Sequence, residues 1–278
     1  MIKRILKIAL FLLGIYIAGL VLIYFNQEKF IFLPTKLEAD YAFQFDRDFQ
    51  EINLETSDKI QLNCLYFKTT KPKGVVYYLH GNSGDLSGWG DISDIYLDLG
   101  YDVFILDYRG FGKSEGKIKN EKELYEDVQL GYDFLKKKFY ESQIVVIGYS
   151  IGTGAASHLA AENSPKMLIL QAPYYNLTEM AKTRMPFVPS FLLKYKFDNQ
   201  KNIVNTKCPV YIFHGDNDKT IYYEDAVKLQ NYLKKEDYYF TLPGQGHNGI
   251  NENPDFIEKL NEILGDSGIF VQIKNPSP

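Results

Sequence analysis

A serine between two glycines is the position in this chain best suited to covalent chemistry. Residues 148–152 read Gly-Tyr-Ser-Ile-Gly and follow an apolar, β-branched run at residues 144–147. This pattern predicts a strand, a sharp turn and a helix, with Gly148 and Gly152 where neighbouring backbone comes too close for a side chain. The turn exposes the Ser150 hydroxyl at a helix N-terminus, whose amides favour negative charge. We therefore predict that Ser150 is a nucleophile; the alternative is a glycine-rich turn with an incidental serine.

A serine hydroxyl needs a base to take its proton and an acid to orient that base. On a turn of this kind the expected chain order is serine, then aspartate or glutamate, then histidine, with both partners in loops after later strands. Two carboxylates, Asp216 and Asp218, follow a predicted strand at residues 210–213, and one histidine, His247, follows a predicted strand at 238–242. His247 is therefore predicted to be the base, and the acid is Asp216 or Asp218.

Acyl transfer also needs two amide donors for the oxygen that becomes negative in the transition state. The backbone N–H of Ile151, directly after the serine, is predicted to be one of them. Residues 80–84 read His-Gly-Asn-Ser-Gly and follow a predicted strand, so the backbone N–H of Asn82 is the candidate for the other. His80 is expected to brace this loop, not to act as a second base.

The elements that position these residues alternate between short apolar strands and helices. The pattern predicts strands at residues 75–79, 103–106, 144–148, 167–170, 210–213 and 238–242, and helices at 86–99, 121–139, 153–162, 222–235 and 254–264. Such alternation predicts an α/β fold, in which helices cover both faces of a mostly parallel sheet. Residues 51–55 and 60–67 predict an antiparallel hairpin before it.

One interval departs from this rhythm. Residues 173–207 contain three prolines and six aromatic residues and separate two predicted strands. An insertion at this position would lie over the carboxyl ends of the strands, where open α/β sheets bind ligands. We predict a small lid; the alternative is an additional helical hairpin that completes the core.

The N-terminal part of the chain predicts a membrane anchor. Residues 8–25 contain no charged residue and can span the hydrocarbon core as a helix. Three cations precede this stretch, which favours a cytoplasmic N-terminus with the rest of the chain outside the cytoplasmic membrane. A cleaved signal peptide is the alternative, but bulky residues lie three positions before the plausible cleavage sites. The predicted organisation is an anchor at 1–26, a connecting segment at 27–48, a domain at 49–265 and a C-terminal tail at 266–278.

Composition narrows the classes of function. The chain has 278 residues, of which 45% are hydrophobic, and a net charge of −4. No basic stripe interleaves with aromatics, which argues against a nucleic-acid partner. The four histidines lack metal-ligand spacing, so neither a metal nor another cofactor is expected. Cys64 and Cys208 are interpreted as two buried thiols, with a disulfide as the alternative.

Five short motifs follow one another along residues 50–265. They are His-Gly-Asn at 80–82, Asp-Tyr-Arg-Gly-Phe-Gly-Lys-Ser-Glu-Gly at 107–116, Gly-Tyr-Ser-Ile-Gly at 148–152, His-Gly-Asp-Asn-Asp at 214–218 and Gly-His at 246–247. Together and in this order they resemble the α/β-hydrolase family. The second motif, the anchor and the short lid are similar to a subgroup of single-pass membrane hydrolases, which resembles the α/β-hydrolase-domain proteins that include eukaryotic depalmitoylases. The resemblance implies Asp218 as the acid, Asp216 as a loop brace and a structural role for residues 107–116.

The resemblance and the predicted residues imply a membrane-anchored serine hydrolase that cleaves carboxylic esters or thioesters through an acyl-enzyme. The aromatic insertion and the anchor favour an apolar acyl chain or a lipid-like substrate. A serine peptidase or amidase on the same fold is one alternative, although such enzymes commonly carry an extra domain that this chain lacks. A non-catalytic membrane-anchored scaffold is another; it predicts damaged site residues, which the sequence does not show.

Overall fold

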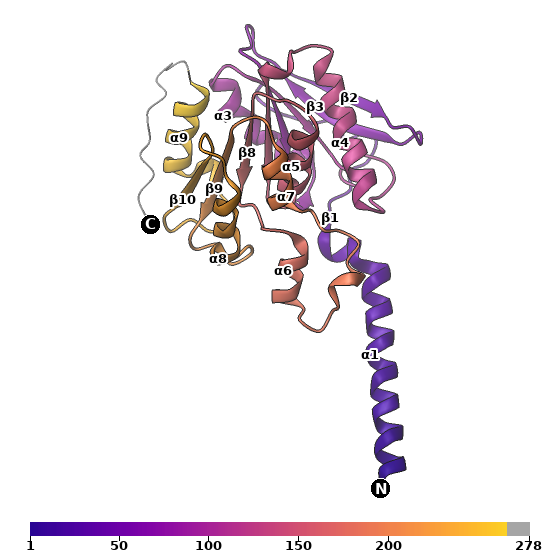
Figure 1. Ribbon diagram of the computed structural model, residues 1–278. Helices are drawn as coiled ribbons and strands as arrows, with labels where there is room; N and C mark the ends of the chain where they lie inside the picture. The colour runs from indigo at the N-terminus through magenta and orange to yellow at the C-terminus, as the bar shows by residue number, and fades with distance from the viewer. Residues whose placement is uncertain (266–278) are drawn as a thin grey trace.

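An eight-stranded sheet organises the part of the chain that the structure describes, residues 1–265 (Figure 1). The structure is a computed structural model, and the tail predicted at 266–278 lies outside the described residues. The strands are β2 Phe49–Glu55, β3 Gln61–Phe67, β4 Val75–Leu79, β6 Asp102–Leu106, β7 Ile144–Tyr149, β8 Met167–Gln171, β9 Val210–Gly215 and β10 Tyr238–Leu242. Their spatial order is β10-β9-β8-β7-β4-β6-β3-β2, which puts the strand before Ser150 in the interior of the sheet.

The pairing is mostly parallel, as predicted. Strands β4 and β6 to β10 run parallel, whereas β2, β3 and β6 are joined by antiparallel ladders. Ile52 on β2 lies opposite Cys64 on β3, and this register confirms the predicted hairpin. Because the parallel strands share one direction, the loops after them meet at a single edge of the sheet.

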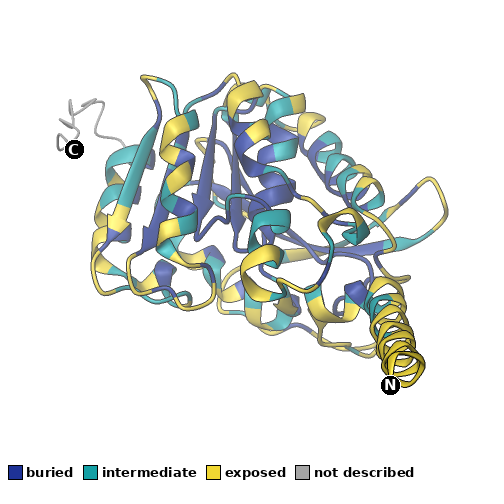
Figure 2. Cartoon of the chain, turned by 60° about the horizontal axis from the view of Figure 1, so that its bottom comes forward, coloured by how far each residue is buried: buried dark blue, intermediate teal, exposed yellow. Residues whose placement is uncertain are grey.

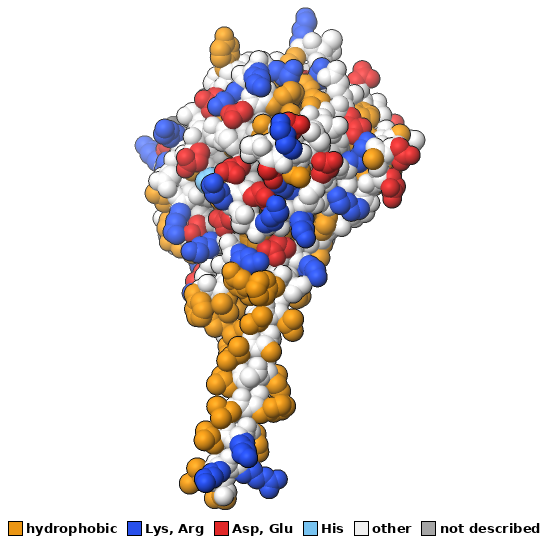
Figure 3. All heavy atoms as spheres, turned by 90° about the vertical axis from the view of Figure 1, so that its right-hand side faces the viewer, with side chains coloured by type: hydrophobic (Ala, Val, Ile, Leu, Met, Phe, Trp, Pro, Cys, Tyr) orange, Lys and Arg blue, Asp and Glu red, His pale blue; other side chains and the backbone are white. Residues whose placement is uncertain are grey.

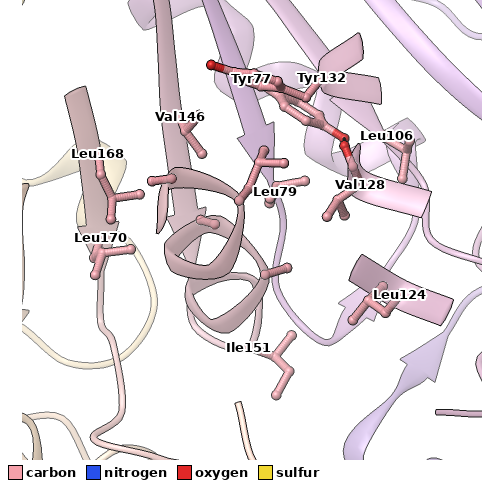
Figure 4. Packing of buried hydrophobic residues seen from close by; sticks show 14 of the residues in the cluster. Tyr77, Leu79, Leu106, Leu124, Val128, Tyr132, Val146, Ile151, Leu168 and Leu170 are labelled. Carbon is pink, nitrogen blue, oxygen red and sulfur yellow. Dashed lines mark hydrogen bonds between the residues drawn. The ribbon is translucent and has the colours of Figure 1, made fainter. Parts of the chain in front are cut away.

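Helices cover both faces of the sheet. On one face lie α4 (Glu121–Lys136), α5 (Gly152–Glu162) and α7 (Asn199–Asn205), and on the other lie α3 (Ser93–Asp98) and α9 (Pro254–Leu264). Alternate residues of β4 enter the two cores: Tyr77 and Leu79 pack beneath α4 and α5 (Figure 4), and Val76 and Tyr78 pack beneath α3. The strands are therefore buried between exposed helix surfaces (Figure 2), and the predicted α/β class is confirmed.

Two predicted helices are broken, and in these places the prediction was wrong. Residues 86–99 form α2 (Leu86–Trp89), a 3₁₀ turn at Gly90–Ile92 and α3. Glycines at 88 and 90 weaken a continuous α-helix, and a Cβ at Gly90 would collide with the Phe45 ring. Residues 222–235 form α8 (Tyr223–Ala226) and a 3₁₀ helix at Val227–Tyr232. A repeat of three residues per turn puts the buried Ala226 and Leu229 on one side of that segment.

The segment between β8 and β9 divides into two parts. Its first part forms α6 (Leu177–Arg184) and a 3₁₀ turn at Ser190–Leu192, which extend below the sheet (Figure 1). Its second part, α7, packs into the core, where Asn199 is buried and donates to Thr153 Oγ1 at 3.1 Å and to the Tyr174 carbonyl at 2.8 Å. The second part therefore completes the core, whereas the lid stays a prediction for the first part, which is called the lid below.

The N-terminal helix α1 (Ile2–Ile31) projects from the domain (Figure 1). It is long and apolar enough to cross a membrane, and its apolar window is not buried in the domain. Its backbone departs from helical geometry at Asn26, and after it β1 (Leu33–Pro34) pairs with β5 (Ser83–Gly84). Phe32 is buried in the core, so the connecting segment packs on the domain.

Both cysteines are free and buried, which confirms their interpretation as buried thiols. Burial raises the pKa of the Cys64 thiol well above its ordinary value and that of Cys208 to about 12. Neither thiol is therefore ionised near neutral pH.

Candidate active site

Ser150 occupies a strained turn between β7 and α5. Its φ angle is 52°, in the left-handed region that a non-glycine residue rarely adopts. A Cβ at Gly148 would lie 2.6 Å from the Ala156 Cβ, and one at Gly152 would collide with the Leu79 carbonyl oxygen. These close approaches confirm why glycine stands at both positions. The strain is held by the surrounding backbone, since the Ser150 N–H donates to the Gln171 carbonyl at 2.9 Å.

The structure brings Ser150, His247 and Asp218 together in one hydrogen-bonded series. Ser150 Oγ lies 3.0 Å from His247 Nε2, and His247 Nδ1 lies 2.8 Å from Asp218 Oδ2. Asp218 is in the loop after β9 and His247 in the loop after β10, so all three come from carboxyl ends of parallel strands. A base within hydrogen-bonding distance of a hydroxyl, itself oriented by a carboxylate, is the arrangement that activates a serine.

Of the two carboxylates in the loop after β9, Asp218 is the one that contacts His247. Burial by itself raises the pKa of the Asp218 carboxyl, but the hydrogen bonds from His247, Ile221 and Thr220 outweigh burial and leave the pKa below its ordinary value. The backbone N–H groups of Thr220 and Ile221 donate to Asp218 Oδ1 at 2.7 and 2.8 Å. Asp216 Oδ1 instead accepts from the Gly244 N–H at 2.7 Å and so braces the loop that carries His247.

Two residues that the sequence did not single out support the histidine and the carboxylate. The Tyr149 hydroxyl donates to the His247 carbonyl at 2.6 Å and fixes the position of its loop. His214 is fully buried, with Nε2 2.9 Å from the Ile221 carbonyl and 3.4 Å from Asp218 Oδ2. Burial lowers the pKa of His214. Tyr149 is visible in the sequence only as the variable position next to the serine.

The loop after β4 faces the same site and is held from two sides. The Leu33 N–H donates to the Asn82 carbonyl at 2.7 Å, and the Asn82 side chain donates to the Ile31 carbonyl at 3.2 Å, so the end of α1 and β1 fix this loop. Within residues 1–265 the backbone N–H groups of Ile151 and Asn82 donate no hydrogen bond to other protein groups. Both residues border the same cavity as Ser150.

His80 contacts the structural turn that follows β6. Its Nε2 lies 3.2 Å from Asp107 Oδ1, and its backbone carbonyl accepts from the Tyr108 hydroxyl at 3.0 Å. The turn is held in place by Arg109, which is buried and pairs with Asp127 at 2.6 Å. These contacts agree with the bracing role predicted for His80 and the structural role implied for residues 107–116.

An apolar cavity of about 210 Å³ adjoins Ser150. One wall comes from α6, and the residues there are Leu177, Met180, Ala181 and Arg184. The opposite wall comes from the end of α1, through Ile23, Gln27, Phe30 and Ile31. The sequence placed these four residues in the anchor and the connecting segment and did not identify them as part of a site.

Known proteins share this architecture. The esterase Pf2001 of Pyrococcus furiosus superposes with a TM-score of 0.66 at 18% identity, covering 84% of this chain and 96% of that one. Lysophosphatidylserine lipase ABHD12 of Rattus norvegicus is 28% identical over 227 residues, which cover 69% of this chain and 56% of that protein. The chain has the α/β-hydrolase fold, and its sequence is similar to α/β-hydrolases.

Two further sequence matches carry other names. The α/β hydrolase domain-containing protein aho-3 of Caenorhabditis elegans is 27% identical over 205 residues, covering 72% of this chain and 60% of that protein. The sequence model of the serine aminopeptidase S33 family matches residues 70–205. This chain spans a little more than half of the length of the curated relatives named here.

Proposed function

We propose that this α/β-hydrolase is a membrane-anchored serine hydrolase that cleaves carboxylic esters or thioesters. The observation that carries the proposal is the series Ser150–His247–Asp218, with separations of 3.0 and 2.8 Å, beside an apolar cavity. Activation of a serine requires a base in hydrogen-bonding reach and a group that orients the base. The scaffold alternative is disfavoured, because a binding protein has no need of this alignment.

In the proposed mechanism, Ser150 Oγ attacks the carbonyl carbon of the substrate while His247 Nε2 takes the hydroxyl proton. Asp218 holds the imidazole and stabilises its positive charge. The N–H groups of Ile151 and Asn82 donate to the substrate oxygen as it becomes negative. His247 then protonates the departing alcohol or thiol, which leaves an acyl-enzyme on Ser150. A water molecule, deprotonated by His247, attacks this ester and releases the carboxylic acid.

A lipid-like ester is the substrate class that we favour. The cavity next to Ser150 is lined mainly by apolar side chains of α1 and α6, and such a lining suits an acyl chain. The relatives include a protein named for lysophosphatidylserine lipase activity. Amide cleavage is the second candidate, because the family model that matches residues 70–205 carries the name of a serine aminopeptidase.

The proposal includes the arrangement in the membrane. Lys3, Arg4 and Lys7 precede the apolar part of α1, and cations favour the cytoplasmic side. The N-terminus is therefore cytoplasmic, and the hydrolase domain lies outside the cytoplasmic membrane.

The test uses the full-length chain in detergent micelles with p-nitrophenyl esters from acetate to palmitate. Activity that rises with chain length and disappears in Ser150→Ala, together with fluorophosphonate labelling at Ser150 alone, supports a lipid-ester hydrolase. Labelling with activity on amides but on no ester favours the peptidase. A folded wild-type protein that is neither labelled nor more active than Ser150→Ala on any ester or amide would refute the proposed function.

A further inference from the structure

The anchor helix forms one side of the cavity beside Ser150. Ile23, Gln27, Phe30 and Ile31 recur at spacings of four, three and one, which places them on one face of α1. Ile23 belongs to the uncharged stretch at residues 8–25. If that stretch spans a bilayer, one end of the cavity lies at Ser150 and the other, at Ile23, reaches the edge of the hydrocarbon core.

The lid is fastened to the same face of α1. The Gln27 side chain donates to the Leu192 carbonyl at 2.8 Å and accepts from the Lys194 N–H at 3.0 Å. Lys194 Nζ also pairs with Glu28 at 3.1 Å. These contacts hold residues 192–194 against α1 beside the cavity.

The tip of the lid lies beside the apolar part of α1 (Figure 1). The Tyr16 hydroxyl donates to the Phe187 carbonyl at 2.7 Å. Tyr16 precedes Asn26 by ten residues, which corresponds to about 15 Å of helix, or half of a hydrocarbon core about 30 Å thick. If α1 spans a bilayer with Asn26 at its surface, the lid tip, residues 185–192, lies at the depth of one leaflet.

The composition of the lid tip suits lipid better than water. Phe187 and Phe191 are 59% and 83% exposed, and hydrophobic side chains gather where the domain meets α1 (Figure 3). Pro186 and Pro189 have no N–H to satisfy, and the N–H groups of Met185, Val188 and Leu192 donate to nearby carbonyls. The lid tip therefore has fewer backbone N–H groups without a hydrogen-bond partner. Each such group would be energetically costly in contact with lipid.

We infer that the anchor helix is a substrate-binding element, and that a membrane-resident acyl ester enters the cavity laterally from the bilayer, between α1 and α6, with its chain along the Ile23–Phe30 face. The inference rests on the proposed function and adds to it the route of the substrate. In this arrangement the apolar side chains of α1 and α6 bind one acyl chain of the substrate, and the ester carbonyl lies at Ser150.

The test compares two tryptophan substitutions on adjacent residues of α1 in the full-length chain in phosphatidylcholine vesicles. Ile23→Trp fills the cavity, whereas Leu22→Trp makes the same kind of change at a residue that is 66% exposed and does not line it. The substrates are p-nitrophenyl palmitate and p-nitrophenyl acetate, and fluorophosphonate labelling counts the functional sites. A misfit in an apolar pocket costs roughly tenfold or more.

We expect Ile23→Trp to lower the palmitate-to-acetate ratio of kcat/KM by at least about tenfold, with labelling intact, and Leu22→Trp to leave it unchanged. An unchanged ratio in Ile23→Trp, or an equal fall in Leu22→Trp, overturns the inference. If Ile23→Trp is not labelled, Ile23→Ala takes its place, and an unchanged chain-length preference then overturns it. A wild-type protein that is neither labelled nor active refutes the proposed function instead.

A second measurement tests the depth of the lid tip. The chain has one tryptophan, Trp89, so the emission added by Phe191→Trp can be followed against a constant background. The matched variant is Tyr140→Trp, at a residue that is 82% exposed and lies before β7, at the opposite edge of the sheet. We expect lipids brominated on the acyl chain to quench the first variant and acrylamide to quench the second. Quenching of both by acrylamide alone overturns the insertion of the lid.

Discussion

The two aspartates after β9 differ by one contact, and this contact separates a role in catalysis from a role in loop structure. Asp218 Oδ2 lies 2.8 Å from His247, whereas Asp216 Oδ1 accepts from the Gly244 N–H. We expect Asp218→Asn to lower kcat about 10³- to 10⁴-fold, because an amide neither holds the required tautomer nor stabilises the imidazolium. Asp216→Asn keeps an oxygen acceptor and is expected to stay within a few-fold of wild type. The kcat of ester hydrolysis by the two variants tests this prediction, and equal losses of kcat would contradict the assignment of Asp218.

The glycine that follows Ile151 gives a second prediction at this scale. A Cβ at Gly152 would collide with the Leu79 carbonyl oxygen and lie 2.6 Å from that of His80, whereas a Cβ at Gly246 meets nothing within 4 Å. We expect Gly152→Ala to reduce the free energy of unfolding by about 1–3 kcal/mol and to lower activity, because the Ser150 turn must shift. Gly246→Ala should change neither. Thermal unfolding and esterase assays of both variants test this, and a Gly152→Ala protein as stable as wild type would refute it.

At the scale of elements, the positions of the strands were the easiest feature to predict from the sequence. Runs such as residues 75–79 and 144–148 are apolar throughout, which only a strand buried on both faces requires, and β4 and β7 lie there. The residues that could supply a nucleophile, base and acid were placed by these strands, because each follows one. The continuity of helices was harder to predict. At position 90 a glycine is needed because the ring of Phe45, which is distant in the sequence, leaves no room for a side chain.

The wall contributed by α1 could not be foreseen for a different reason. An uncharged stretch indicates that a helix can enter lipid, but it does not indicate which face of the helix contacts the domain. The sequence did not single out Gln27 either, because it lies within the polar run at residues 26–29, although its side chain bonds Leu192 and Lys194. Its partners lie 165 and 167 residues away, in a segment without regular periodicity.

The attachment of the lid to the anchor gives a prediction for these two elements. Gln27→Leu removes both hydrogen bonds and leaves the Leu192 carbonyl and the Lys194 N–H without partners, a loss of about 1–3 kcal/mol. We expect faster amide hydrogen exchange at residues 185–196, by one order of magnitude or more. Asn26→Leu is the control, because Asn26 bonds only within α1, to the Leu22 carbonyl. Exchange that is the same in the two variants would mean that Gln27 does not hold the lid.

For the whole molecule, the buried His214 links stability to pH. Burial lowers its pKa in the folded state, so below an unfolded pKa of about 6.5 the unfolded chain binds more protons and stability falls as pH falls. We expect the stability of wild type to fall between pH 6.5 and 5 more steeply than that of His214→Gln, by up to about 1.4 kcal/mol per pH unit. Unfolding of the two proteins in the same detergent across this range measures the difference. Parallel curves would show that His214 is not the group responsible.

The orientation of the chain in the membrane is also a property of the whole molecule. If the cations before α1 hold the N-terminus in the cytoplasm, protease added to sealed right-side-out vesicles of the cytoplasmic membrane should reach exposed sites of the domain and spare a tag fused before Met1. Replacement of Lys3, Arg4 and Lys7 by glutamine should weaken this bias. A domain that resists protease until the vesicles are broken open would reverse the proposed orientation.

The order of the site residues along the chain has a consequence for biosynthesis. His247 follows Ser150 by 97 residues and Asp218 by 29, whereas the apolar helix α1 comes first. A ribosome therefore delivers the membrane-binding segment long before the base that activates the serine, and β10 must add to the edge of the sheet before the base is positioned. If α1 enters the membrane as it is synthesised, the nascent protein is tethered there before Ser150, Asp218 and His247 can assemble.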